Sequence, residues 1–119
     1  MLPIIPLVIG VGAVVAGAAV PAARASQRRQ RLVQAKARAR AVYRRLEFCV
    51  ETIDPGADLT AADELSRASE RWHTAGALLA EAVSEEQCAV AEDVAQEGLD
   101  HVAAACRKLG IDPPVISGA

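Results

Sequence analysis

The sequence has 119 residues, of which 52% are apolar, 3% aromatic and 24% charged, so its length allows one small folded unit. Alanine occurs 26 times, whereas Phe, Trp and Tyr occur once each. This composition excludes a β-sandwich or β-barrel and favours an all-α fold. The net charge of -2 is unevenly distributed, because residues 24–45 carry nine basic and no acidic residues, while residues 46–119 carry four basic and 15 acidic ones. We therefore expect the basic segment to face an anionic partner.

Residues 1–23 form the first predicted element, a transmembrane anchor. From Leu2 to Ala23 the chain has 22 uncharged residues, ten of them Leu, Ile or Val. A helix of this length measures about 33 Å, enough to cross the hydrocarbon core of a bilayer. A cleaved signal peptide is the main alternative, but such a peptide has positive charges before its apolar run, and here they follow it.

The charges after this segment predict its orientation and its contacts. Four arginines lie where positive charge favours the cytoplasmic side, so we expect a single-pass protein of the cell membrane with its C-terminal part in the cytoplasm. The same side chains are our candidates for contact with anionic lipid headgroups: Arg24, Arg28, Arg29 and Arg31. Within the span, small residues spaced four apart favour close packing of two membrane helices: Gly12 with Ala16, and Ala13 with Gly17.

Residues 24–53 read as a basic juxtamembrane amphipathic helix. Its apolar positions recur at alternating spacings of three and four, the heptad pattern of a coiled coil: Leu32, Ala35, Ala39, Val42, Leu46, Cys49 and Ile53. The helix should end at Asp54-Pro55-Gly56, because a residue before proline is disfavoured in the helical region and glycine permits a turn. Arg31, Arg38 and Arg45 recur beside this apolar stripe, and we expect the latter two to pair with acids such as Glu64, Glu85 or Glu92.

Residues 61–110 are predicted to form an acidic helical hairpin, followed by a flexible tail at 111–119. Thr60 with Asp63 resembles a capping box, as does Ser84 with Gln87. Two apolar stripes run out of phase on either side of Ser84, which favours a turn there, although one helix over 61–109 with a local phase slip is an alternative. The stripes are Leu65, Ala68, Trp72, Ala75, Leu79 and Ala82, then Cys88, Ala91, Ala95, Gly98, Val102, Ala105 and Leu109. Together with the basic helix they predict a small, Ala-rich antiparallel bundle of about three helices.

Chemical signatures are few in this sequence. Phosphate-binding glycine loops, GxSxG, HExxH and dinucleotide motifs do not occur, so we expect no enzyme and no cofactor. Glu70 with His73, and Glu97 with His101, share helix faces, but a di-iron bundle needs further inward carboxylates, and we predict no metal site. Three cysteines without a CxxC pair indicate free thiols in a reducing compartment, not a disulfide framework: Cys49, Cys88 and Cys106.

These features favour a membrane-anchored interaction, scaffold or accessory protein with a cytoplasmic bundle. Its expected partners are anionic membrane lipids, together with a second copy of the chain or another membrane protein, because the Ala-rich stripes bury little area within one chain. The dimer interface would include the span and the stripe at Ala35 and Ala39. Alternatives are a membrane-active protein that oligomerises and permeabilises the bilayer, a metal-binding bundle, or a nucleic-acid-binding basic helix. The last lacks a recognition motif, since only Tyr43 and Phe48 could stack on bases.

Overall fold

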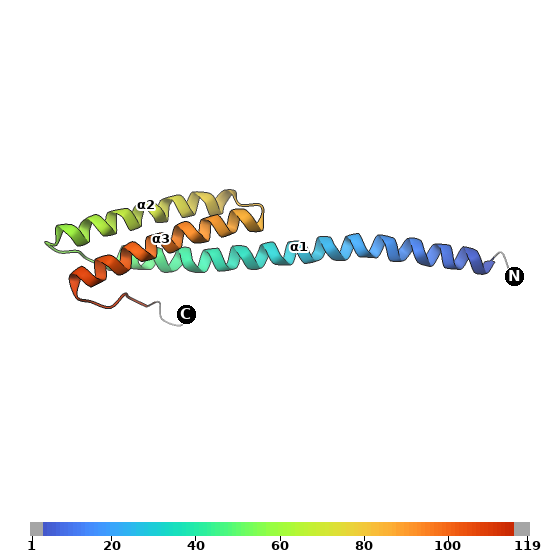
Figure 1. Cartoon of the computed structure of the whole chain (residues 1–119), viewed down its shortest axis with the longest axis horizontal. Helices are drawn as coiled ribbons and strands as arrows, with labels where there is room; N and C mark the ends of the chain where they lie inside the picture. The colour runs from blue at the N-terminus through green and yellow to red at the C-terminus, as the bar shows by residue number, and fades with distance from the viewer. Residues whose placement is uncertain (1–3, 116–119) are drawn as a thin grey trace.

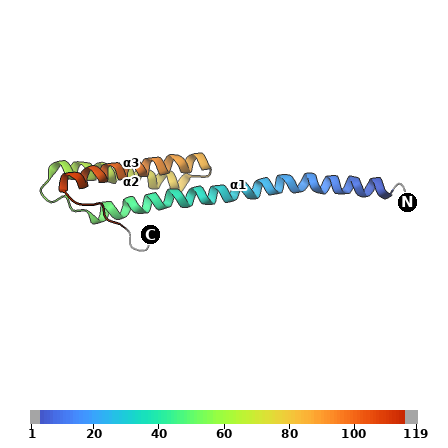
Figure 2. The ribbon, with the colours of Figure 1, turned by 60° about the horizontal axis from the view of Figure 1, so that its bottom comes forward.

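The computed structural model describes the backbone of residues 4–115 and the side chains of residues 21–115. It consists of three helices: α1 (Ile4–Thr52), α2 (Leu59–Glu81) and α3 (Glu85–Leu109). The C-terminal half of α1 packs against the hairpin of α2 and α3, while its N-terminal half projects beyond the hairpin (Figure 1). The same arrangement is visible in the rotated view of Figure 2. The predicted all-α fold and its three-helix bundle are confirmed.

Helix α1 is continuous from Ile4 to Thr52 and contains Pro21. It ends where the sequence predicts, because Pro55 follows and Gly56 adopts a φ of 59°, a left-handed conformation that a side chain would strain. The backbone N–H of Gly56 also donates to Asp54 Oδ1 at 2.9 Å. The chain thus reverses direction within a few residues.

Helix α2 begins earlier than the sequence predicts. Its N-cap is Asp58, whose carboxylate accepts a hydrogen bond from the backbone N–H of Ala61 at 3.0 Å. The predicted capping box at Thr60 and Asp63 is therefore wrong, since both residues lie inside the helix and Asp63 pairs instead with Arg67 at 3.2 Å. Asp58 therefore has the capping role that the sequence predicts for Thr60, two residues earlier in the chain.

The turn at Ser84 is confirmed, and the alternative of one helix over 61–109 is wrong. Ser84 is the N-cap of α3, and its hydroxyl accepts from the backbone N–H of Gln87 at 3.2 Å. Gln87 Oε1 accepts in return from the backbone N–H of Val83 at 2.7 Å, one residue before the cap. At its other end α3 terminates at Gly110, whose φ of 68° is the left-handed conformation common after helices.

The core contains the three apolar stripes predicted from the sequence. Their members are buried or half-buried, and most buried positions are Ala or Cys. Gly98 allows close contact between α1 and α3, because a Cβ at this position would lie only 2.5 Å from Cδ2 of the fully buried Leu46. Trp72 packs against this core but is half-buried, and its Nε1 is the one buried side-chain polar atom without a hydrogen-bond partner among residues 21–115.

One expectation about self-association does not hold. Ala35 and Ala39 are 6% and 1% exposed, because the chain's own bundle covers them, with Ala35 packed beside Ala82 and Cys88. Small side chains let the helices approach closely enough to bury the stripe within one chain. The stripe is therefore not available as a dimer interface.

The predicted anchor at 1–23 and its packing residues Gly12, Ala13, Ala16 and Gly17 lie outside the described side chains, except for residues 21–23. Among residues 21–115, whose side chains the structure describes, no helix has the length and apolar character that crossing a membrane requires.

Candidate functional site

A basic, exposed stretch of α1 lies just beyond the end of the hairpin. Every residue from 21 to 30 is exposed, as is Arg31, and burial begins at Leu32. Arg24, Arg28 and Arg31 are spaced by four and three residues, so they share the helix face that continues as Ala35 inside the bundle. This face of α1 is thus apolar where the hairpin covers it and basic beyond the end of the hairpin.

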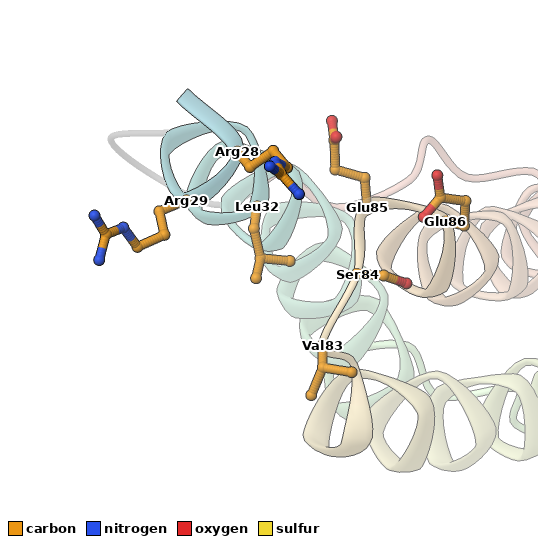
Figure 3. A pocket seen from close by; sticks show the side chains of 7 residues that line it. All are labelled: Arg28, Arg29, Leu32, Val83, Ser84, Glu85 and Glu86. Atoms are coloured by element: carbon orange, nitrogen blue, oxygen red, sulfur yellow. The ribbon is translucent and has the colours of Figure 1, made fainter. Parts of the chain in front are cut away.

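A groove with a volume of about 330 Å³ lies between this stretch and the α2–α3 turn. It is lined by Arg28, Arg29, Leu32, Val83, Ser84, Glu85 and Glu86. In Figure 3, Arg28 extends from α1 toward the turn, whereas Arg29 points to the other side of the helix. Val83 is 75% exposed in the turn, so an exposed apolar side chain and Arg28 border the same groove.

The two glutamates of the groove belong to the first turn of α3. Negative charge is favourable there, because the first N–H groups of a helix carry partial positive charge. Among residues 21–115, neither Glu85 nor Glu86 lies within 4.0 Å of a basic side-chain nitrogen. Their position is therefore explained by α3 itself, and Arg28 and Arg29 have no ion-pair partner in the described part.

The expected ion pairs of Arg38 and Arg45 with the hairpin are wrong. Within the described residues no carboxylate oxygen lies within 4.0 Å of either guanidinium group. The pairs that do form are Arg67 with Asp63 at 3.2 Å, Arg71 with Glu97 at 3.5 Å, and His101 with Glu64 at 2.7 Å. All three lie within the α2–α3 hairpin and none links it to α1.

The contact between His101 and Glu64 is the shorter of the two side-chain ion pairs that join α2 to α3 in the described residues. Nδ1 of His101 lies 2.7 Å from Oε2 of Glu64, and both side chains are more than two-thirds buried. The hydrogen bond from His101 lowers the pKa of the Glu64 carboxyl from its ordinary value of 4.5. Sequence spacing gave no indication of this pair, because its residues are 37 positions apart and His101 has Glu97 as a helical neighbour.

The two Glu/His pairs noted in the sequence, Glu70 with His73 and Glu97 with His101, do not come together as a metal centre. Glu97 binds Arg71, and His73 lies against the Trp72 ring with centroids 4.7 Å apart. Between residues 21 and 115, no group of three His, Cys, Asp or Glu side chains is arranged to hold a metal ion.

The three cysteines are free and at most 2% exposed. Burial raises the pKa of both Cys49 and Cys106 above the ordinary thiol value of 9.0, and the guanidinium of Arg45 opposes this shift only in part at Cys49. The thiols of Cys49 and Cys106 therefore stay protonated at neutral pH, and all three cysteines pack as small apolar core residues.

Comparison with protein-family models, with curated proteins and with solved structures finds no match for this chain. The fold and the site define an all-α three-helix bundle whose first helix extends as a basic, exposed segment.

Proposed function

We propose that the protein is a membrane-anchored interaction or accessory protein. In this proposal residues 1–23 anchor the chain in the cell membrane, and the bundle lies on the cytoplasmic side. The arginines at 24, 28, 29 and 31 contact anionic headgroups. The supporting observation is the continuity of α1, since one helix contains the apolar segment, the exposed basic turns and the first helix of the bundle.

The dimensions of α1 are consistent with this role. Residues 24–31 extend about 12 Å along the helix axis, and the polar layer on each side of a bilayer is about 5 to 8 Å thick. The first arginines would thus lie among the headgroups, with the groove at Leu32 just beyond them. At about 1 kcal/mol for each arginine near the surface, the four arginines would contribute at most about 4 kcal/mol.

Charge reversal tests the proposal. The variant with Glu at positions 24, 28, 29 and 31 should insert poorly or in mixed orientations, because positive charge beside a span fixes its orientation. The measurement is protease accessibility of the C-terminal tail in sealed vesicles. A matched control reverses the four arginines within the bundle at positions 38, 40, 44 and 45 and should keep the original orientation. Equal behaviour of the two variants would contradict the proposal.

Self-association remains part of the proposal, through α1 outside the bundle. Gln27 lies about three helical turns beyond Ala16 on the same side of the helix, whereas Ala25 lies on the opposite side. In a variant whose three native cysteines are replaced by Ser, a cysteine at position 27 should form disulfides between copies in mild detergent more readily than one at position 25. A monomer by light scattering, or equal cross-linking at both positions, would contradict pairing.

A further inference from the structure

A second groove lies between α1 and α2 inside the bundle, away from the hairpin turn. Its volume is about 250 Å³, and its lining residues are Arg40, Tyr43, Arg44, Gly76, Leu79 and Ala80. None of these residues is acidic. The groove therefore combines two cationic side chains and a phenol with an apolar wall from α2.

The two arginines are positioned to act on one ligand. Arg40 and Arg44 are one helical turn apart on the same face of α1, and both are exposed. Among residues 21–115, neither guanidinium has a carboxylate oxygen within 4.0 Å. Their donors are thus free to bind an anion, for which the planar guanidinium group is well suited.

Tyr43 is held in place between these arginines. Its ring stacks on Trp72 with centroids 6.1 Å apart and an interplanar angle of 27°. Gly76 makes room for the phenol, because a Cβ there would lie 2.9 Å from the Tyr43 hydroxyl oxygen. Within the described part of the chain this hydroxyl makes no hydrogen bond. It is therefore a further donor fixed at the edge of the groove.

We propose that this groove binds a phosphate group, through the guanidinium groups of Arg40 and Arg44 and the hydroxyl of Tyr43, with the remainder of the ligand against Leu79. Phosphate binding by these side chains does not depend on the proposed membrane anchor, whereas the choice between a free solute and a headgroup rests on it. A phosphate offers several acceptor oxygens to such a donor set, and two guanidinium groups offset its charge of nearly -2. Arg44 lies about 30 Å along α1 from Ala23, well beyond the Debye length, so a free phosphorylated solute fits the site better than a headgroup of the anchoring membrane.

The experiment is a titration of the full chain, in a non-ionic detergent at low salt, with inorganic phosphate and pyrophosphate. Trp72 is the only tryptophan of the chain and stacks on Tyr43, so its fluorescence reports on the groove. The variant R40Q/R44Q should bind at least tenfold more weakly than the wild type. The variant Y43F keeps the aromatic stack, loses one donor, and should bind about two- to tenfold more weakly.

The matched control is R38Q/R45Q, which removes two arginines from α1 outside this groove. Its affinity should stay within twofold of the wild type, and thermal unfolding by circular dichroism identifies any variant that fails to fold. A wild type without phosphate-dependent fluorescence or calorimetric heat would overturn the proposal, as would equal losses in the two double variants. A second arm measures binding to vesicles that contain a phosphomonoester lipid. Binding to these vesicles alone, with none to soluble phosphate or pyrophosphate, would also overturn the proposal in favour of a headgroup.

Discussion

Gly98 provides a sharp test of how α1 packs on α3. In the substitution G98A, the new Cβ would lie 2.5 Å from Cδ2 and 3.0 Å from Cδ1 of Leu46, whereas carbon atoms in contact are usually about 3.5 to 4.0 Å apart. Leu46 is fully buried and cannot turn toward solvent. Overpacking of this kind costs about 1 to 3 kcal/mol, while replacing a helical glycine by alanine contributes about 1 kcal/mol. We expect a net loss of up to about 2 kcal/mol in the wild-type background.

The double-mutant cycle with Leu46→Ala separates these two effects. L46A alone should lower the free energy of unfolding by about 2 to 5 kcal/mol, because it leaves a cavity. In that background the clash with Leu46 is absent and only the close approach to Cβ of Arg71 at 3.1 Å remains, so G98A should be less destabilising than in the wild-type background. The assay is urea unfolding of the full chain in detergent, followed by circular dichroism and by Trp72 fluorescence. An equal effect of G98A on the free energy of unfolding in both backgrounds would refute the packing of Leu46 against Gly98.

Further predictions concern the thiols, the polar pair and the helix cap. The buried thiols of Cys49, Cys88 and Cys106 should not react with maleimide in the folded chain, whereas all three should react in denaturant, as measured by mass. Rapid labelling of the folded chain would show that they are accessible. The folded-state pKa of Glu64 is lowered, so its stabilising effect is present above pH 4.5 and is lost as the pH falls through the folded-state value. The acid-side loss of the free energy of unfolding should therefore be smaller in E64Q than in the wild type, and an identical pH dependence would argue against the bond to His101. Replacing Asp58 by Ala should cost about 1 kcal/mol in urea unfolding, whereas Thr60→Ala should cost less; the reverse order would place the cap at Thr60.

The sequence predicted the parts of this fold that depend on local periodicity. The stripe through Leu46 and Cys49 and the turn at Ser84 follow from helical spacing and capping chemistry, which act over a few residues. The burial of Ala35 and Ala39 within the bundle was not predicted, because the area covered by two Ala-rich helices depends on how closely they approach. That distance is set by packing between distant segments, such as the contact of Gly98 with Leu46.

In the candidate sites, too, local features follow from the sequence, whereas features that depend on packing between distant segments do not. The basic residues from Arg24 to Arg31 were identified from charge and position, since both are visible in the sequence. The groove at Arg40 and Arg44 was not identified, because Gly76 and Leu79 approach these arginines only after α2 folds back on α1. Likewise, the pairing of His101 with Glu64 depends on the register between two helices, which the spacing within either helix does not determine.

The central claim is that α1 anchors the chain in a membrane through residues 1–23. Its most direct test is alkaline carbonate extraction of membranes from cells expressing the full chain, followed by the intact mass of the protein in the pellet. The account predicts that the protein stays in the pellet and keeps its first 23 residues, with a mass of 12.4 kDa. Release into the supernatant, or a chain that begins near Ala25 or Ser26, would contradict it.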